Sequence, residues 1–327
     1  MDINLNVKVP AIEKLIDYSA SGIGAVAGSM LAPWKASREG KARIESTKAD
    51  IQITELHETA LLETRKRIEN YDPLEQSGNL DNYVSERIQF QEQKRLANAK
   101  SVIFKAAQEL GDKEVPDQEP DHDWTARFFS FVQDVSSEEM QILWAKILAG
   151  QVERPDSMSL RTLGVLQEMD RNTAELFEKF CSMCMFLETH DGVYDGRICS
   201  LGKNAGDNSL ESFGLNFGKL NQLQEYGLII SDYNSWRNYS IPEFEKYNIP
   251  LTSVPFRFQN NLWILTQVNT DKHVREIKIT GPSLSISGQE LSRVVECKPA
   301  PEFTEKLQGF LQTKNLRMME VNTIPKG

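Results

Sequence analysis

Residues 136–180 have the sequence SSEEMQILWAKILAGQVERPDSMSLRTLGVLQEMDRNTAELFEKF, which carries the clearest fold signals in the chain. Ser136 followed by Glu139 matches a capping box and predicts the start of a helix. Gly150 is expected to end this helix, and Asp170 to cap a later one. We therefore predict a compact bundle of short helices here. The apolar face of its first helix consists of Met140, Leu143, Trp144, Ile147 and Leu148.

The chain before this bundle is charged and favours helix between residues 35 and 110. The sequence YDPLEQSGNLD, residues 71–81, interrupts it, because Pro73 and Gly78 are costly inside a helix. We predict two helices that pair as an antiparallel hairpin. The apolar face of the second consists of Ile88, Leu96, Val102, Ile103, Ala106 and Leu110.

Residues 22–34, GIGAVAGSMLAPW, form a small, apolar and uncharged segment. Its Gly24 and Gly28 have the GxxxG spacing that lets two helix backbones approach closely. The segment is too short to span a bilayer. Three interpretations stay open: a Gly-rich helical turn docked on the rest of the protein, a self-association surface, or a membrane contact. The candidate interaction residues are Gly22, Gly24, Gly28 and Trp34.

Residues 191–327 combine helix and strand patterns. A helix that ends at Gly227 precedes a short strand at 228–230, and a hairpin is predicted over 254–268. With the phrase SISGQEL at 285–291, this order resembles winged-helix modules. Asn216, Lys219 and Asn221 are candidate interaction residues on the predicted helix. A helix that contacts DNA normally carries several basic side chains, so protein contact is favoured.

The expected fold is therefore α+β and predominantly α-helical. We expect an N-terminal helical region over residues 1–112, which includes the apolar glycine-rich segment. A compact helical bundle follows over 113–190, and a winged-helix-like α+β domain over 191–327.

The composition is that of an ordinary globular protein, with 40% hydrophobic and 26% charged residues. The net charge of −10 disfavours nucleic acid as a partner, because binding requires phosphate neutralisation. Four cysteines are too few for a secreted disulfide scaffold, and the first residues lack a signal-peptide pattern. We expect a cytoplasmic protein, with peripheral contact at the inner membrane through residues 22–34.

No catalytic or cofactor-binding motif is found. Cys181-x-x-Cys184 is the only cysteine pair with metal-ligand spacing, and Cys199 and His190 would be needed to complete a zinc site. Cys184 lies in an apolar stretch, where cysteine usually packs as a small hydrophobic residue. The sequence contains no GxSxG, GxxxxGK[ST] or GxGxxG motif after a strand. We expect no catalytic site, no cofactor and no metal.

The stretch from Asp134 to Phe177 resembles bacterial proteins catalogued as domain of unknown function 2806, and more distantly the alpha-type abortive-infection proteins. The first resemblance implies no activity. The second implies a role in phage defence, in which infection leads to growth arrest or membrane damage. The residues that carry the resemblance are Ser137, Glu139, Gln141, Trp144, Ala145, Leu148, Ala149, Pro155, Ser159, Leu160, Arg161, Thr162, Leu163 and Phe177.

Three functions follow as hypotheses. The first is a non-enzymatic interaction or sensor protein of anti-phage defence, which oligomerises or acts on membranes through its N-terminal helices. The second is a DNA-binding regulator that uses the winged-helix-like section. The third is a hydrolase or nuclease whose site matches no motif.

Overall fold

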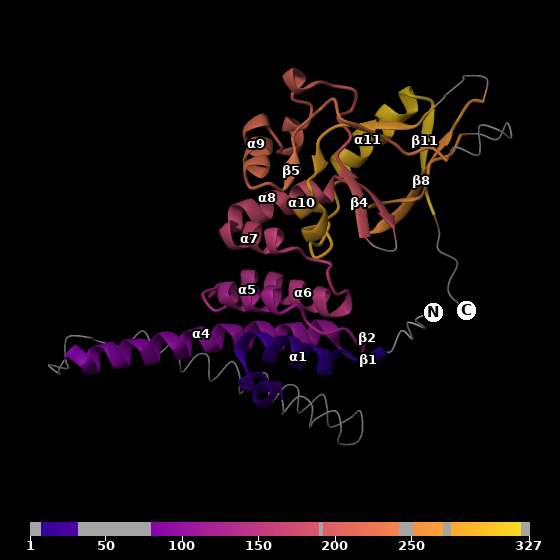
Figure 1. The fold of residues 1–327 in the computed structure, drawn as a ribbon. Helices are drawn as coiled ribbons and strands as arrows, with labels where there is room; N and C mark the ends of the chain where they lie inside the picture. Colours follow the sequence, from indigo (N-terminus) through magenta and orange to yellow (C-terminus); the bar gives the residue numbers. More distant parts are fainter. Residues whose placement is uncertain (1–7, 32–79, 190–191, 242–250, 271–275, 322–327) are drawn as a thin grey trace. The chain divides into compact units, whose positions relative to one another are not determined.

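The computed structural model describes residues 8–31, 80–189, 192–241, 251–270 and 276–321. Contacts divide the chain into two compact units, residues 1–160 and 161–327, and each is described by itself. The architecture is mixed, with more residues in helices than in strands (Figure 1). The helices that the sequence analysis grouped over 113–190 are shared between the two units. The first arm of the predicted N-terminal hairpin lies outside the described residues.

The described part of the first unit is helical apart from one small ribbon. Its long helix α4 and helix α6 run in the same direction (Figure 1), since Ser101 Oγ donates to Gln141 at the start of α6 and Lys113 pairs with Glu153 at its end. Strand β1 pairs antiparallel with β2. The elements are β1 (Lys8–Pro10), α1 (Ala11–Ile23), α4 (Leu80–Leu110), β2 (Glu114–Pro116), α5 (His122–Val132) and α6 (Glu138–Glu153).

Aromatic side chains fill the core of this unit. The ring of Phe128 lies 5.0 Å from that of Trp124 in a stacked arrangement and 5.3 Å from that of Trp144 in an edge-on one. All three side chains are buried. Aromatic pairs at these separations add to the free energy gained from burial. The predicted core role of Trp144 is confirmed.

The predicted boundaries of helix α6 need two corrections. Ser137, and not Ser136, is its N-cap, with an extended backbone and a side chain that accepts from the N–H of Met140. The Ser137 hydroxyl also donates to Glu139 over 2.8 Å. Gly150 does not end the helix, which continues to Glu153, because a glycine inside a helix is destabilising but does not stop the hydrogen-bond ladder.

Four of the six residues predicted on the apolar face of α4 are buried. Val102, Ile103, Ala106 and Leu110 are buried, whereas Ile88 and Leu96 are exposed. The reason is the position of α6, whose first turn reaches α4 at Asn98 and Ser101 through Gln141. Described helices therefore cover α4 only in its C-terminal half.

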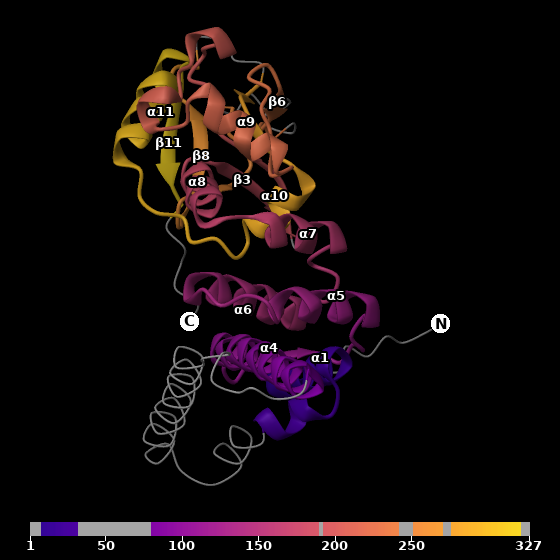
Figure 2. The same ribbon diagram turned by 90° about the vertical axis from the view of Figure 1, so that its left-hand side faces the viewer.

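The second unit is built on a seven-stranded antiparallel sheet with the strand order β11-β8-β7-β3-β4-β10-β5. A separate ribbon pairs β6 with β9. Figure 2 shows β8 next to β11, and α11 lies against β11. The strands are β3 (Met185–Thr189), β4 (Gly192–Arg197), β5 (Ile229–Ile230), β6 (Trp236–Asn238), β7 (Phe256–Phe258), β8 (Asn261–Gln267), β9 (Lys278–Thr280), β10 (Ser283–Leu284) and β11 (Leu316–Glu320).

Several predicted elements of this unit are confirmed. Asp170 caps α8 by accepting from the N–H of Thr173, and Gly227 follows helix α9 with a φ of 73°. The hairpin predicted over 254–268 is β7 with β8. The helices are α7 (Leu160–Glu168), α8 (Arg171–Ser182), α9 (Phe217–Glu225), α10 (Ile286–Leu291) and α11 (Pro301–Thr313), with 3₁₀ turns at Ala205–Asp207 and Glu211–Phe213.

Strand β3 is a correction. Residues up to 190 were predicted to belong to a helical bundle, but Met185–Thr189 forms a central strand between β4 and β7. An apolar run such as CMFL fits a buried helix and a buried strand equally well. The neighbouring strands β4 and β7 decide between them.

Candidate functional site

The N-terminal glycines that were candidate interaction residues have three different surroundings. A Cβ on Gly22 would lie 2.0 Å from the ring of Phe129, so this glycine permits close packing of α1 on α5. Gly24 ends α1 with a φ of 79°, and residues 26–31 form a further helical turn. A Cβ added at Gly28 would meet no atom within 4 Å. Trp34 lies outside the described residues.

These surroundings bear on the GxxxG interpretation. Gly24 and Gly28 do not lie on one continuous helix, because the backbone bends at Gly24. Ala27 and Leu31, which lie on the turn after the bend, are fully buried. The geometry of the described residues therefore matches the docked, Gly-rich turn. The self-association and membrane interpretations remain predictions.

Alanine substitutions at Gly22 and at Gly28 should distinguish a glycine needed for packing from one needed for self-association. We expect Gly22→Ala to lower the free energy of unfolding by about 1–3 kcal/mol, because the added methyl group overpacks the interface with Phe129. Gly28→Ala should leave it unchanged or raise it by up to about 1 kcal/mol, because an added Cβ meets no atom within 4 Å and alanine favours the helical turn. Urea denaturation measures both. A large loss of oligomer in Gly28→Ala at unchanged stability would instead support a GxxxG interface.

The candidate residues on α9 are used in different ways. Asn216 is the N-cap and accepts from the N–H of Lys219 over 3.0 Å. Gln222 donates to Thr173 Oγ1 and ties α9 to the start of α8. The Lys219 side chain is exposed, and that of Asn221 is half-buried. Of the three candidates, only Lys219 presents a charge to solvent.

The four cysteines are free and buried. Burial raises the pKa of the Cys181, Cys184 and Cys297 thiols, and that of Cys199 to about 11. A buried thiol with a raised pKa holds little of the nucleophilic thiolate. His190 lies outside the described residues, and the described ranges contain no group of three or more His, Cys, Asp and Glu side chains that could hold a metal.

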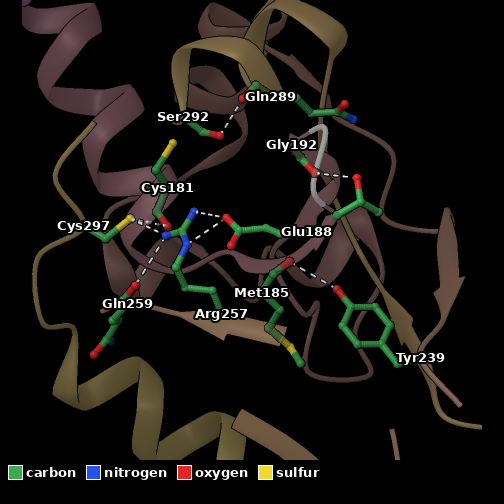
Figure 3. A network of polar contacts seen from close by, with 11 residues as sticks. Cys181, Met185, Glu188, Gly192, Tyr239, Arg257, Gln259, Gln289, Ser292 and Cys297 are labelled. Atoms are coloured by element: carbon green, nitrogen blue, oxygen red, sulfur yellow. Dashed lines mark hydrogen bonds and ion pairs between the residues drawn. The ribbon is translucent and has the colours of Figure 1, made fainter. Parts of the chain in front are cut away.

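A polar network around Arg257 occupies one part of the second unit (Figure 3). Arg257 Nε and Nη2 lie 2.8 and 2.7 Å from Glu188 Oε1, and its Nη1 contacts the carbonyl of Gln259 and the thiol of Cys297. The guanidinium also lies 4.0 Å from the ring centre of Phe186.

The Cys297 thiol donates to the carbonyl of Cys181 over 3.6 Å. Arg257 thus links β3, β7 and the segment before α11. Each of its three guanidinium nitrogens contacts a protein group, an arrangement typical of a structural ion pair.

Exposed aromatic and aliphatic side chains are also found on β4, β5 and β6. Trp236 is 53% exposed, Ile230 52% and Tyr194 40%. Two cations lie over the aromatic rings, Lys278 at 4.2 Å from Trp236 and Arg237 at 5.1 Å from Tyr194. We call these five residues the β6 surface. Trp236 and Lys278 lie on one face of the β6–β9 ribbon, and Arg237 lies over Tyr194 on the other. Trp, Tyr and Arg are the side chains most enriched in protein-binding hot spots.

The charge of the chain is unevenly distributed between the units. Residues 161–327 contain 18 Lys and Arg against 20 Asp and Glu, whereas residues 1–160 contain 19 against 27. Most of the excess negative charge, which is expected to repel nucleic acid, therefore lies in the first unit. On the β6 surface, Lys278 is paired with Glu276 over 2.7 Å, so this surface is not strongly basic.

The β6 surface was not predicted from the sequence. The stretch SDYNSWRNY has aromatic and polar residues without a clear period, so nothing in it distinguishes a buried Trp from an exposed one. The exposure of Trp236 depends on the ribbon lying at the edge of the unit. The adjacent Trp236 and Arg237 are the only signal in the sequence, and it becomes informative once the structure shows that both side chains are exposed.

The model of the family described as protein of unknown function (DUF2806) matches residues 82–308, which is more than half of the chain. The chain belongs to this family. The match begins in α4 and ends in α11, so the DUF2806 region includes both the Arg257 network and the β6 surface. The resemblance to this family expected from residues 134–177 is confirmed. No curated protein and no solved structure matches the chain.

Among the described residues, no helix is both long enough and apolar enough to cross a membrane.

Proposed function

We propose that this DUF2806 protein is a non-enzymatic interaction protein that contacts a protein partner through the β6 surface. The proposal is carried by the exposed Trp236 on one face of the β6–β9 ribbon and by Arg237 over the exposed Tyr194 on the other. Soluble proteins expose single large apolar residues routinely, but a group of aromatic residues with an Arg is typical of interface centres.

The biological setting in the proposal is bacterial anti-phage defence of the abortive-infection type. Its support is the distant resemblance of residues 134–177 to alpha-type abortive-infection proteins. In this setting the protein is cytoplasmic, and the turn at residues 26–31 reaches a second copy or the inner membrane through exposed Val26.

Phage plating tests the proposal in cells. Expression of the wild-type protein should lower plaque numbers of some phages, and Trp236→Ala combined with Arg237→Ala should abolish this protection. Met319→Ala is the matched control, because Met319 is also exposed but lies on β11 at the opposite edge of the sheet. Unchanged plating across a broad phage panel would remove the defence setting.

A photo-crosslinking amino acid tests the surface independently of phage. Placed at position 236, it should form one defined crosslinked product in cells, whereas the same group at position 319 should not. Equal, diffuse crosslinking at both positions would argue against a specific partner at the β6 surface.

DNA binding is a second candidate, favoured by the order of elements. Helix α9 is followed by an antiparallel ribbon, β5–β6 with β9–β10, and then by the short helix α10. This order resembles a winged helix, in which the ribbon is the wing. Against it, β7 and β8 lie between the two arms and join the main sheet. Salt-dependent binding of the full chain to duplex DNA would support this candidate, and no binding at low salt would exclude it.

A further inference from the structure

Strand β6 is the open edge of the ribbon. On the other side of β9, Ser200 N–H donates to the carbonyl of Thr280 and Ile198 N–H to that of Pro282. That edge of β9 is therefore covered by the chain that follows β4. The outer side of β6 has no strand partner among the residues that the structure describes.

The backbone register shows which groups point outward. Gly281 N–H donates to Ser235 and Tyr239 N–H to Ile277, so residues 235 and 239 face β9. In an antiparallel ladder the residues between them, Trp236 and Asn238, turn their N–H and C=O groups to the opposite side. The edge thus offers two donors and two acceptors, and no hydrogen bond to them is present within the described ranges.

The side chains of β6 are all exposed and differ between its two faces. Trp236 and Asn238 lie on the face that carries Lys278. Arg237 lies on the other face, over the ring of Tyr194. A strand added at this edge would meet an aromatic side chain on one face and a cation on the other.

The central Arg237 decides against a second copy of the chain. Two β6 strands paired antiparallel about a twofold axis through residue 237 would place two Arg237 side chains directly opposite one another. Like charges directly opposite in a sheet are destabilising, whereas opposite charges stabilise it. A partner strand with a carboxylate at this position fits the edge better.

We propose that the outer edge of β6 binds an extended peptide segment of another protein by strand addition, with an Asp or Glu opposite Arg237 and apolar residues beside Trp236. Backbone hydrogen bonds to Trp236 and Asn238 would supply affinity, and the alternating side chains specificity. This inference rests on the proposed function, since it names the partner chemistry of the same surface.

Fluorescence anisotropy with synthetic peptides of about eight residues, a usual strand length, tests the proposal. The probe alternates Val and Thr around a central Glu, and the control peptide has Lys in its place. The full-length protein should bind the Glu peptide at least about tenfold more tightly than the Lys peptide. Arg237→Glu should reverse this preference.

A proline tests the backbone contacts. Asn238→Pro removes an N–H that points outward, where proline is tolerated at a sheet edge. Asn238→Ala keeps the N–H but removes the side chain that accepts from Ser240, so it is the matched control. We expect Asn238→Pro to abolish binding of the Glu peptide and Asn238→Ala to retain it. Thermal melting checks that both variants are folded.

Three results would overturn the inference. The first is no binding of the Glu peptide at millimolar concentration, and the second is binding that Asn238→Pro and Arg237→Glu leave unchanged. The third is a wild-type dimer in light scattering that Asn238→Pro dissociates, which would make the occupant a second copy. A defined crosslink at position 236 without peptide binding would retain the proposed function and reject strand addition.

Discussion

Gly288→Ala is expected to lower the free energy of unfolding of the second unit by about 3 kcal/mol or more, at the upper end of what overpacking costs. A Cβ at this position would lie 2.0 Å from the carbonyl oxygen of Leu228. That oxygen also accepts from the N–H of Ser285, and Ser285 in turn caps α10 by accepting from the N–H of Gly288. Backbone on both sides fixes the contact, so neither side can move away cheaply. Chemical denaturation followed by circular dichroism measures the loss.

Gly309→Ala is the matched control, because Gly309 lies exposed in α11 with no atom within 4 Å of the added Cβ. Alanine should stabilise that helix by up to about 1 kcal/mol. A Gly288→Ala protein as stable as the wild type would show that α10 does not pack on Leu228 in this way.

Asp195→Ala should cost about 3–5 kcal/mol of unfolding free energy, because it leaves the buried guanidinium of Arg197 without its carboxylate. The two side chains are joined by contacts of 2.8 and 2.7 Å, and only 9% and 6% of their areas are exposed. Arg197 Nη1 is itself buried and makes no hydrogen bond to the described part of the chain. Urea denaturation measures the change.

Two comparisons give this result its meaning. The double variant Asp195→Val with Arg197→Met should regain most of the lost stability, because it removes both charges from the interior. Glu175→Ala breaks the exposed pair with Arg171 and should cost less than about 0.5 kcal/mol. An Asp195→Ala protein that unfolds like Glu175→Ala would mean that Arg197 reaches water.

Helix ends and the larger turns were predictable because their signals are local. Asp170 and Gly227 act through hydrogen bonds and backbone angles within a few residues, so the sequence contains the whole cause. The shift from Ser136 to Ser137 has the same origin, since two adjacent serines can both cap a helix and only the backbone angle selects one.

The β6 surface and the half-exposed face of α4 were not predictable in this way. Ile88 and Leu96 fit the apolar pattern as well as Val102 does, and they differ only in whether α6 reaches them. Trp144 lies in the apolar stretch MQILWAKILAG and was predicted in the core, whereas SDYNSWRNY around Trp236 has no apolar period from which burial or exposure could be read.

The sequence alone determined the family, the N-cap of α8, the glycine that ends α9, the β7–β8 hairpin and the core around Trp144. These depend on interactions between residues that are close in the chain, or on apolar periodicity within one element. Only the tertiary structure decided that Met185–Thr189 is a central strand, that Gly22 packs against Phe129, and that the outer edge of β6 has no strand partner within the described ranges. Each of these depends on which distant segment lies alongside, and burial or exposure follows from that neighbour.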